Sequence, residues 1–172
     1  MKIQTGDVAN CYMRDKFLSK AISKVTNSDL CHTAIFIYKD GVLNVAESQK
    51  DGFNTKTFDN WVKDYNYDYI ITRPKLARTK HVLDQVDKYK GTTPYDKFSF
   101  FIRQPIRLIK IWSNKRFGTN FNTWKDNGKE DMKMYCSEVV AKIIGVPNYY
   151  EMTPKDVYEW QLNNGYKIIT ND

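Results

Sequence analysis

The sequence is poor in the residues that build disulfide frameworks and zinc sites. It contains three cysteines and two histidines in 172 residues. An odd and small number of cysteines, without a secretion signal, argues against a disulfide framework. The cysteines and histidines also lack the spacing of a zinc site built from these residue types. We therefore expect no disulfide framework, no bound metal and no organic cofactor.

Long apolar runs are missing as well. No stretch approaches the ~20 apolar residues that cross a membrane as a helix. Residues 1–7 lack the apolar core of a signal peptide. The sequence has no glycine-rich phosphate loop, no internal repeat and no low-complexity segment. It predicts a cytoplasmic chain without a transmembrane segment, or an exported chain if a leader was removed.

The composition indicates one folded domain with a basic surface. Hydrophobic residues make up 41% of the chain and aromatic residues 15%, which suffices for a core in a single domain over residues 1–172. The net charge is +7 and the pI is about 9.2, which favours anionic partners such as nucleic acid, anionic lipid or a cell-wall polymer. The basic residues are scattered and no nucleic-acid motif is present. Charge alone therefore does not choose among these partners.

A cysteine precedes an apolar helical pattern near residue 136. The apolar residues of 139–144 recur at helical spacing, and Gly145 is a helix stop signal. Cys136 then stands in the first turn, where free backbone N–H groups and the helix dipole stabilise an anion. Such an environment favours the thiolate, the nucleophilic form of cysteine. Cys136 is either a nucleophile or a small core residue at a helix start, and a nearby base would decide between these interpretations.

An Asp–Gly dipeptide between two apolar runs predicts a β-hairpin. Residues 30–38 and 42–48 are rich in strand-forming residues, and Asp40–Gly41 between them is a strong signal for a two-residue turn. In this register Lys39 pairs with Val42. The hairpin matters because each of its strands carries one polar residue of interest.

Counting outward from the turn brings these polar residues together. Ala34 then faces Glu47, and His32 faces Gln49. His32 and Glu47 share one face of the hairpin as diagonal neighbours, whereas a slip of one residue would separate them. His32 is therefore a candidate general base, with a solvated polar residue near the strand end as the alternative. Cys31 points to the other face and is interpreted as a packing residue.

The remaining patterns complete the order of elements. We expect helices at residues 16–25, 53–65 and 77–90, a capped helix from Thr153–Pro154, and strands at residues 67–73 and 166–170. Residues 98–112 mix apolar and basic side chains, which indicates either a core helix with snorkelling basic residues or a surface that contacts lipid or polymer. This order predicts an α+β domain in which helices pack against an antiparallel sheet.

Six segments together carry a family resemblance. They are Gly6-Asp7-Val8, residues 29–35 around His32, residues 45–48 around Glu47, the turn at residues 91–96, Tyr135-Cys136-Ser137-Glu138-Val139-Val140, and Thr153-Pro154. Each is similar to a motif of the permuted papain-like cysteine hydrolases of the NlpC amidase superfamily, especially of its YiiX/YebB-like branch. The resemblance covers most of the chain, and the segment around Cys136 is its most specific part.

The resemblance implies a fold, an activity and roles for three residues. The fold is a permuted papain-like (NlpC-type) fold with the nucleophile Cys136 at a helix N-terminus. His32 is implied as the base and Glu47 as the third polar residue, in the chain order of the permuted group. Members of this superfamily typically cleave amide bonds, often in peptidoglycan peptides. We therefore expect a cysteine peptidase or amidase that acts through an acyl-enzyme on a peptide, cell-wall or acyl substrate.

Three further residues are expected to line the oxyanion or substrate site. The resemblance implies that Tyr95 lies near the nucleophile, where its hydroxyl could donate to the oxyanion or its ring could stack on substrate. Tyr135 immediately precedes the nucleophile, and Gln49 faces His32 in the predicted register. An amide can also orient an imidazole, so the third member of the site is either Glu47 or Gln49.

Other functions stay open at this level. A lipid-directed acyltransferase or thioesterase would use the same cysteine and histidine, with residues 98–112 in contact with membrane. A non-catalytic module with this fold would direct its positive charge at a polyanion. A hydrolase of a protein conjugate is a further possibility, for which the sequence has no distinguishing feature.

Overall fold

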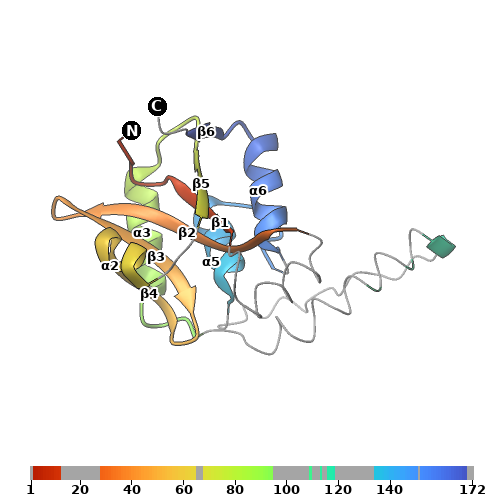
Figure 1. Ribbon diagram of the computed structural model, residues 1–172, viewed down its shortest axis with the longest axis horizontal. Coiled ribbons are helices and arrows are strands. Elements are labelled where there is room, and N and C mark those ends of the chain that lie inside the picture. Colours follow the sequence, from red (N-terminus) through yellow and green to blue (C-terminus); the bar gives the residue numbers. More distant parts are fainter. Residues whose placement is uncertain are drawn as a thin grey trace.

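The structure is a computed structural model that describes residues 2–12, 28–64, 68–94, 109, 113, 116–118, 134–150 and 152–169. Its centre is a six-stranded sheet in the order β4-β3-β2-β1-β5-β6, and every neighbouring pair is antiparallel (Figure 1). The strands are β1 (Val8–Tyr12), β2 (Leu30–Lys39), β3 (Val42–Gln49), β4 (Gly52–Thr57), β5 (Asp68–Arg73) and β6 (Lys167–Ile169). The predicted α+β class with an antiparallel sheet is confirmed.

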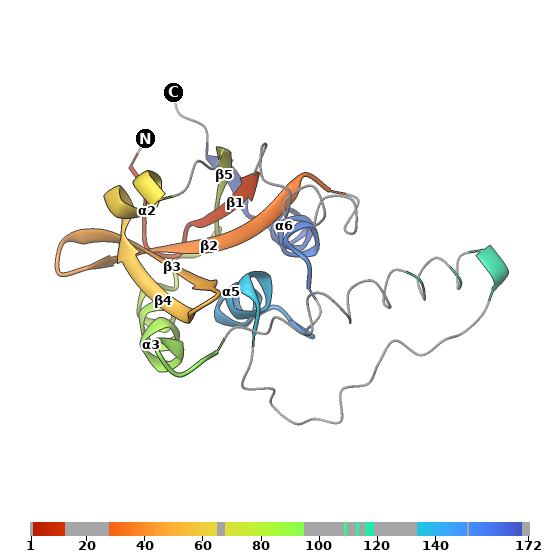
Figure 2. The same cartoon turned by 60° about the horizontal axis from the view of Figure 1, so that its bottom comes forward.

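The helices of the described residues cover both faces of this sheet. They are α2 (Phe58–Asp64), α3 (Thr79–Tyr89), α5 (Cys136–Ile144) and α6 (Pro154–Asn163). Figure 2 shows α2 on one side of the sheet and α3 and α5 on the other. Accordingly, Ile35 of β2 packs in one apolar cluster with side chains of α3, α5 and α6, whereas its neighbours Ala34 and Phe36 pack in a second cluster with Trp61 of α2.

The central hairpin has the register that the Asp–Gly turn predicts. Lys39 pairs with Val42, and the ladder continues without a slip to the pair Ile35–Ala46. Asp40 and Gly41 both have positive φ, 52° and 76°, as a tight primed turn requires. The register prediction is confirmed over this ladder, but the predicted pairs Ala34–Glu47 and His32–Gln49 lie beyond its end and are not part of it.

The helix expected at residues 53–65 is wrong in its first half. Gly52–Thr57 is strand β4, which pairs with β3 from Gln49–Gly52 to Asn44–Thr57, and only Phe58–Asp64 is helical. A second Asp–Gly dipeptide, Asp51–Gly52, marks this turn, and the φ of Gly52 is +98°. The same signal that identified the first hairpin could therefore have identified this one.

Both C-terminal helices begin where the sequence indicates, and α5 also ends where it indicates. Gly145 caps α5 in the left-handed conformation with a φ of 81°. At the start of α6, the Thr153 hydroxyl accepts from the Asp156 N–H (3.1 Å), and the Asp156 carboxylate accepts from the Thr153 N–H (2.8 Å). The predictions for α3, β5 and β6 are also confirmed within one or two residues at each described end.

Two predicted segments lie outside the described residues. These are the helix at residues 16–25 and the apolar and basic segment at residues 98–112, of which only residue 109 is described. Within the part of the chain that the structure describes, no helix is long and apolar enough to cross a membrane.

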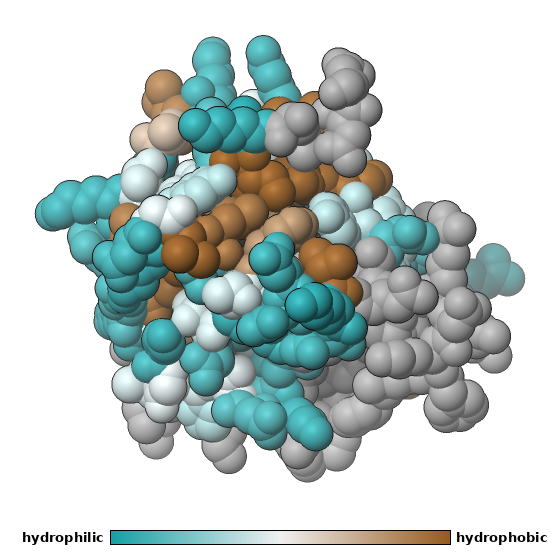
Figure 3. All heavy atoms as spheres, turned by 60° about the vertical axis from the view of Figure 1, so that its left-hand side comes forward, coloured by the Kyte–Doolittle hydropathy of each residue, from teal (hydrophilic) through white to brown (hydrophobic). Residues whose placement is uncertain are grey.

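From the side of the β2–β3 hairpin, Figure 3 shows a band of apolar side chains between polar ones.

The Gly6-Asp7 segment has a structural role. The Asp7 carboxylate, 1% exposed, accepts from Nε and a terminal nitrogen of Arg73 at 2.8 and 2.7 Å, and from the Gln4 N–H at 2.8 Å. The Arg73 guanidinium also donates to the Lys2 carbonyl (2.8 Å). This network fastens the N-terminal segment to β5.

We expect Asp7→Ala to lower the free energy of unfolding by about 2 kcal/mol. Loss of a fully buried ion-pair partner costs about 3 to 5 kcal/mol, but Arg73 is partly exposed and would regain water. Urea unfolding followed by circular dichroism measures the change. The matched control is Asp87→Ala, which breaks the exposed Lys39–Asp87 pair (2.9 Å) and should cost much less, because water screens this pair. Equal losses in the two variants would contradict a special role for Asp7.

Candidate active site

Cys136 is the first residue of α5, and its position is held from three sides. The preceding residue, Tyr135, is extended, and its N–H donates to the Glu138 carboxylate of the first turn (3.2 Å). The Ser48 hydroxyl of β3 donates to the Met134 carbonyl (3.0 Å). The Met134 N–H donates to the Pro94 carbonyl (3.2 Å). These bonds fasten the start of α5 to the end of β3 and to the end of the turn at residues 91–94.

The strands of the central hairpin separate at this point. Their ladder ends at Ile35–Ala46, although β2 extends back to Leu30 and β3 extends on to Gln49. The side chains of His32 and Glu47 bridge the separated ends, and His32 Nε2 lies 2.7 Å from Glu47 Oε2. The predicted contact between these two residues is confirmed. Helix α5 packs against the same two strands.

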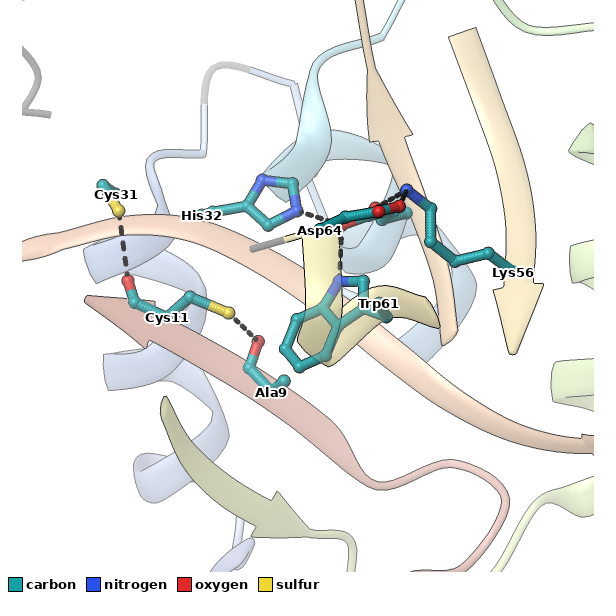
Figure 4. Close-up of polar contacts among 8 residues, drawn as sticks. Ala9, Cys11, Cys31, His32, Lys56, Trp61 and Asp64 are labelled. Atoms are coloured by element: carbon teal, nitrogen blue, oxygen red, sulfur yellow. Dashed lines mark hydrogen bonds and ion pairs between the residues drawn. The ribbon is translucent and has the colours of Figure 1, made fainter. Parts of the chain in front are cut away.

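Glu47 is buried and held by two more residues. The Trp61 indole N–H donates to the same oxygen, Glu47 Oε2 (3.0 Å), and Lys56 Nζ lies 3.6 Å from Oε1. Figure 4 shows His32, Trp61 and Lys56 pointing toward one place from β2, α2 and β4. The Trp61 ring is itself wedged between other rings, with centroids 6.2 Å from Phe36 and 5.4 Å from Tyr69. This packing aims the indole N–H at the carboxylate.

Electrostatics favour the charged forms of both His32 and Glu47. Burial lowers the pKa of His32, but the Cys136 thiol, by charge and hydrogen bond, and then Glu47 outweigh burial and raise the pKa to about 10. Burial raises the pKa of Glu47, but His32, Trp61 and the Gln49 amide outweigh it, so this pKa is below its usual value. An imidazolium therefore stands between a carboxylate and the thiol of Cys136.

The other two cysteines are poor candidates for a nucleophile. Burial, with further contributions from Cys31, Glu47 and Cys136, raises the pKa of the Cys11 thiol well above its usual value. The thiols of Cys11 and Cys31 each approach a backbone carbonyl, of Ala9 (3.9 Å) and of Cys11 (3.5 Å) (Figure 4). Both side chains are buried and free of disulfide bonds, in keeping with the packing role expected for Cys31.

Comparison with known proteins shows that this chain shares its fold with a protein of known structure. No protein-family model and no curated protein matches this chain. The crystal structure of YiiX from Escherichia coli O157:H7 does match, with a TM-score of 0.56 and 23% identity over 87% of this chain and 68% of YiiX. The chain has a YiiX-like fold. The predicted resemblance to YiiX is thereby confirmed at the level of the fold.

YiiX is described as a metalloprotein, which raises the question whether the YiiX-like fold of this chain offers metal ligands. Within the described residues, no three His, Cys, Asp or Glu side chains gather in a way that could hold a metal ion. At the candidate site, His32 Nε2 is already occupied by Glu47, and Glu47 Oε2 also accepts from Trp61. The donor set described here therefore does not fit a metal ion.

The remaining predicted site residues fall in different places on the YiiX-like fold. Tyr135 is 1% exposed at the start of α5, so it supports the position of Cys136 from within the core. Gln49 ends β3, where its amide acts on Glu47. Tyr95 lies outside the described residues, although the turn that precedes it ends at Pro94 beside Met134.

Sequence reasoning missed two neighbours of Glu47, Trp61 and Lys56. Both lie in the segment expected only to be a helix at residues 53–65, yet the Trp61 N–H donates to Glu47. A buried indole N–H needs an acceptor, so a tryptophan on an inward helix face is a signal for a nearby polar group. The signal does not say which polar group, because Trp61 and Glu47 meet only after α2 folds onto the sheet.

Proposed function

We propose that this protein is a cysteine hydrolase that cleaves an amide bond through Cys136, His32 and Glu47. The observation that carries the proposal is the 2.7 Å contact between buried His32 and Glu47, next to a cysteine in the first turn of α5. The raised pKa of His32, to which Cys136 contributes, supports a thiolate–imidazolium pair. The YiiX-like fold is compatible with this function but is not evidence for activity.

The first half of the reaction forms an acyl-enzyme. Glu47 holds His32 at Nε2, which leaves Nδ1 as the ring nitrogen that takes the proton of Cys136. The thiolate sulfur attacks the carbonyl carbon and forms a carbon–sulfur bond, and the carbonyl oxygen becomes an oxyanion. Backbone N–H groups of the first turn of α5 have no intrahelical acceptor and can donate to this oxyanion. The carbon–nitrogen bond then breaks, and His32 gives its proton to the leaving amine.

The second half releases the acid. Water attacks the thioester carbon while His32 accepts a proton from it, and the carbon–sulfur bond breaks. His32 then protonates the departing thiolate, or the two remain as an ion pair. Glu47 stays ionised throughout and stabilises the imidazolium, as its lowered pKa requires. YiiX is described as a metalloprotein, but no step here is routed through a metal because the described donors do not fit one.

The substrate class follows from the resemblance and is part of the proposal. Peptide amides, including those of peptidoglycan, are the first compounds to screen. A lipid-directed acyltransferase or thioesterase would use the same three residues. The surface that would distinguish it, residues 98–112, lies outside the described residues apart from residue 109, so no described contact favours that alternative. The +7 charge is compatible with either kind of anionic partner.

The pH dependence of Cys136 alkylation by iodoacetamide tests the proposal. We expect Cys136 to be labelled rapidly at neutral and mildly acidic pH, because the His32 imidazolium beside it stabilises the thiolate. In His32→Ala this labelling should become much slower over the same pH range. Mass spectrometry assigns the label, and buried Cys11 and Cys31 are internal references. Identical profiles in both proteins would rule out an assembled Cys–His pair.

A further inference from the structure

A cavity lies at the opposite end of α5 from Cys136. Its volume is about 320 Å³, and its lining includes Pro74, Arg78, His81, Ile144, Trp160 and Tyr166. These residues come from the connection between β5 and α3, from α3, from the last turn of α5, from α6 and from the residue before β6. Since α5 has nine residues, about 13 Å of helix separates the cavity from Cys136. The cavity is therefore a separate feature from the candidate active site.

The charged groups of the cavity are cationic. Lys75 and Arg78 line it, and among the described lining residues there is no Asp or Glu. Neither cation makes a side-chain ion pair or hydrogen bond with the rest of the described chain. The Arg78 guanidinium lies near Gly145, where an added Cβ would be 3.7 Å from one of its nitrogens, and its charge acts on the Tyr166 hydroxyl. Two cations without a carboxylate partner at one cavity mark a place for an anion.

The carbonyl groups at the C-terminus of α5 do not need these cations as partners, because other groups already contact them. A cation near the C-terminus of a helix can stabilise its last carbonyl groups. In this structure His81 contacts the Ile143 carbonyl through Nε2 (3.1 Å), and the carbonyls of Ala141 and Lys142 accept from the backbone N–H groups of Val146 (2.9 Å) and Gly145 (3.2 Å). The guanidinium of Arg78 is therefore not needed to satisfy these carbonyls.

The lining of the cavity also includes aromatic and aliphatic side chains. The rings of Trp160 and Tyr166 lie with centroids 6.1 Å apart at an angle of 60°, and both are partly buried against the main apolar cluster. Val82, Ile143 and Ile144 supply aliphatic lining. Tilted aromatic faces of this kind accept a flat ring, and the volume is in the range of small-molecule sites.

We propose that this cavity binds a small organic anion that combines one negatively charged group with one flat ring. The charged group, a phosphate, carboxylate or sulfonate, would pair with Arg78 and Lys75. The ring would pack against Trp160 and Tyr166. This site does not depend on the proposed hydrolase function.

Titration with three probes tests this proposal. Binding is measured by calorimetry and by the amide chemical shifts in NMR spectra. Phenyl phosphate offers a ring and an anion, inorganic phosphate offers the anion alone, and benzyl alcohol offers the ring alone. We expect phenyl phosphate to bind at least about tenfold more tightly than either partial probe. The amide signals of Gly145 and Tyr166 should move most. Equal binding of inorganic phosphate, shifts centred on Cys136, or no binding of phenyl phosphate would each overturn the proposal.

A pair of variants on α3 and its preceding residue provides the matched control. Arg78→Gln should weaken phenyl phosphate at least about tenfold, because it removes the principal cation. Lys80→Gln removes an equal charge that pairs weakly with Asp84 (3.9 Å) and does not line the cavity, so it should leave binding unchanged. Both side chains are exposed, so both variants should fold. An equal loss of phenyl phosphate affinity in the two variants would mean that only the net charge of the protein matters, and it would overturn the proposed site.

A third variant separates this proposal from the proposed function. Cys136→Ala should leave phenyl phosphate binding unchanged, since about 13 Å of helix lies between the two sites. A loss of binding in Cys136→Ala would show that the ligand occupies the candidate active site. This result would overturn the proposal that it binds in the cavity beside Arg78.

Discussion

Replacing Cys136 by alanine should abolish hydrolysis, and replacing His32 by alanine should lower kcat by at least about 10³-fold. Cys136 supplies the only nucleophile of the proposed mechanism, and His32 both creates the thiolate and protonates the leaving group. Because the two act as one unit, the double variant should be no slower than Cys136→Ala. Hydrolysis of peptide para-nitroanilides and of para-nitrophenyl acetate measures these effects, together with capture of an acyl-enzyme by mass spectrometry.

The chain offers matched controls for both residues. Cys31→Ala removes another buried thiol, on β2, and His81→Ala removes the other histidine of the protein. His81 is exposed on α3 and contacts the far end of α5. Both variants should retain activity within about a factor of three, because neither removed group is part of the proposed site. A fully active His32→Ala variant, or a loss of activity in His81→Ala equal to that in His32→Ala, would contradict the mechanism.

Replacing Glu47 by glutamine should lower kcat by about 10² to 10⁴-fold while the protein stays folded. Glutamine keeps the shape and one acceptor oxygen, but it removes the negative charge that raises the pKa of His32. In Glu47→Gln the pKa of His32 is therefore lower than in the native protein. The imidazolium is then lost at a lower pH, and it stabilises the thiolate of Cys136 less at neutral pH. Labelling of Cys136 at neutral pH should therefore slow together with the loss of kcat. Thermal unfolding separates this effect from a change in stability.

Two neighbours of Glu47 show whether the carboxylate itself is required. Trp61→Phe keeps a ring in the aromatic cluster and removes the 3.0 Å hydrogen bond to Glu47, so it should have a smaller effect, about tenfold. Gln49→Ala tests the alternative orienting residue and should have the smallest effect of the three. If Glu47→Gln is fully active and Gln49→Ala is not, the amide of Gln49 would take the role proposed for Glu47.

Local sequence determined the elements that carry the site. The Asp40–Gly41 turn and the alternation on either side of it predicted the hairpin register, because turn type and the two-residue period of strands are local properties. The apolar period after Cys136 and the stop at Gly145 predicted α5 from its first residue. From the register alone, His32 and Glu47 could be assigned to one face. The capping residue Thr153 and the following Pro154 likewise predicted the start of α6.

Only the tertiary structure decided how these elements meet. The insertion of β1 between β2 and β5, and the pairing of Asp7 with Arg73 66 positions away, join separate parts of the chain and have no local signature. The same holds for the Trp61 N–H at Glu47, which exists because α2 packs over that face of the sheet. The separation of β2 from β3 beyond Ile35–Ala46, and the packing of α5 against those strands, likewise come from packing. Periodicity reports which face of an element is apolar, but not which other element covers that face.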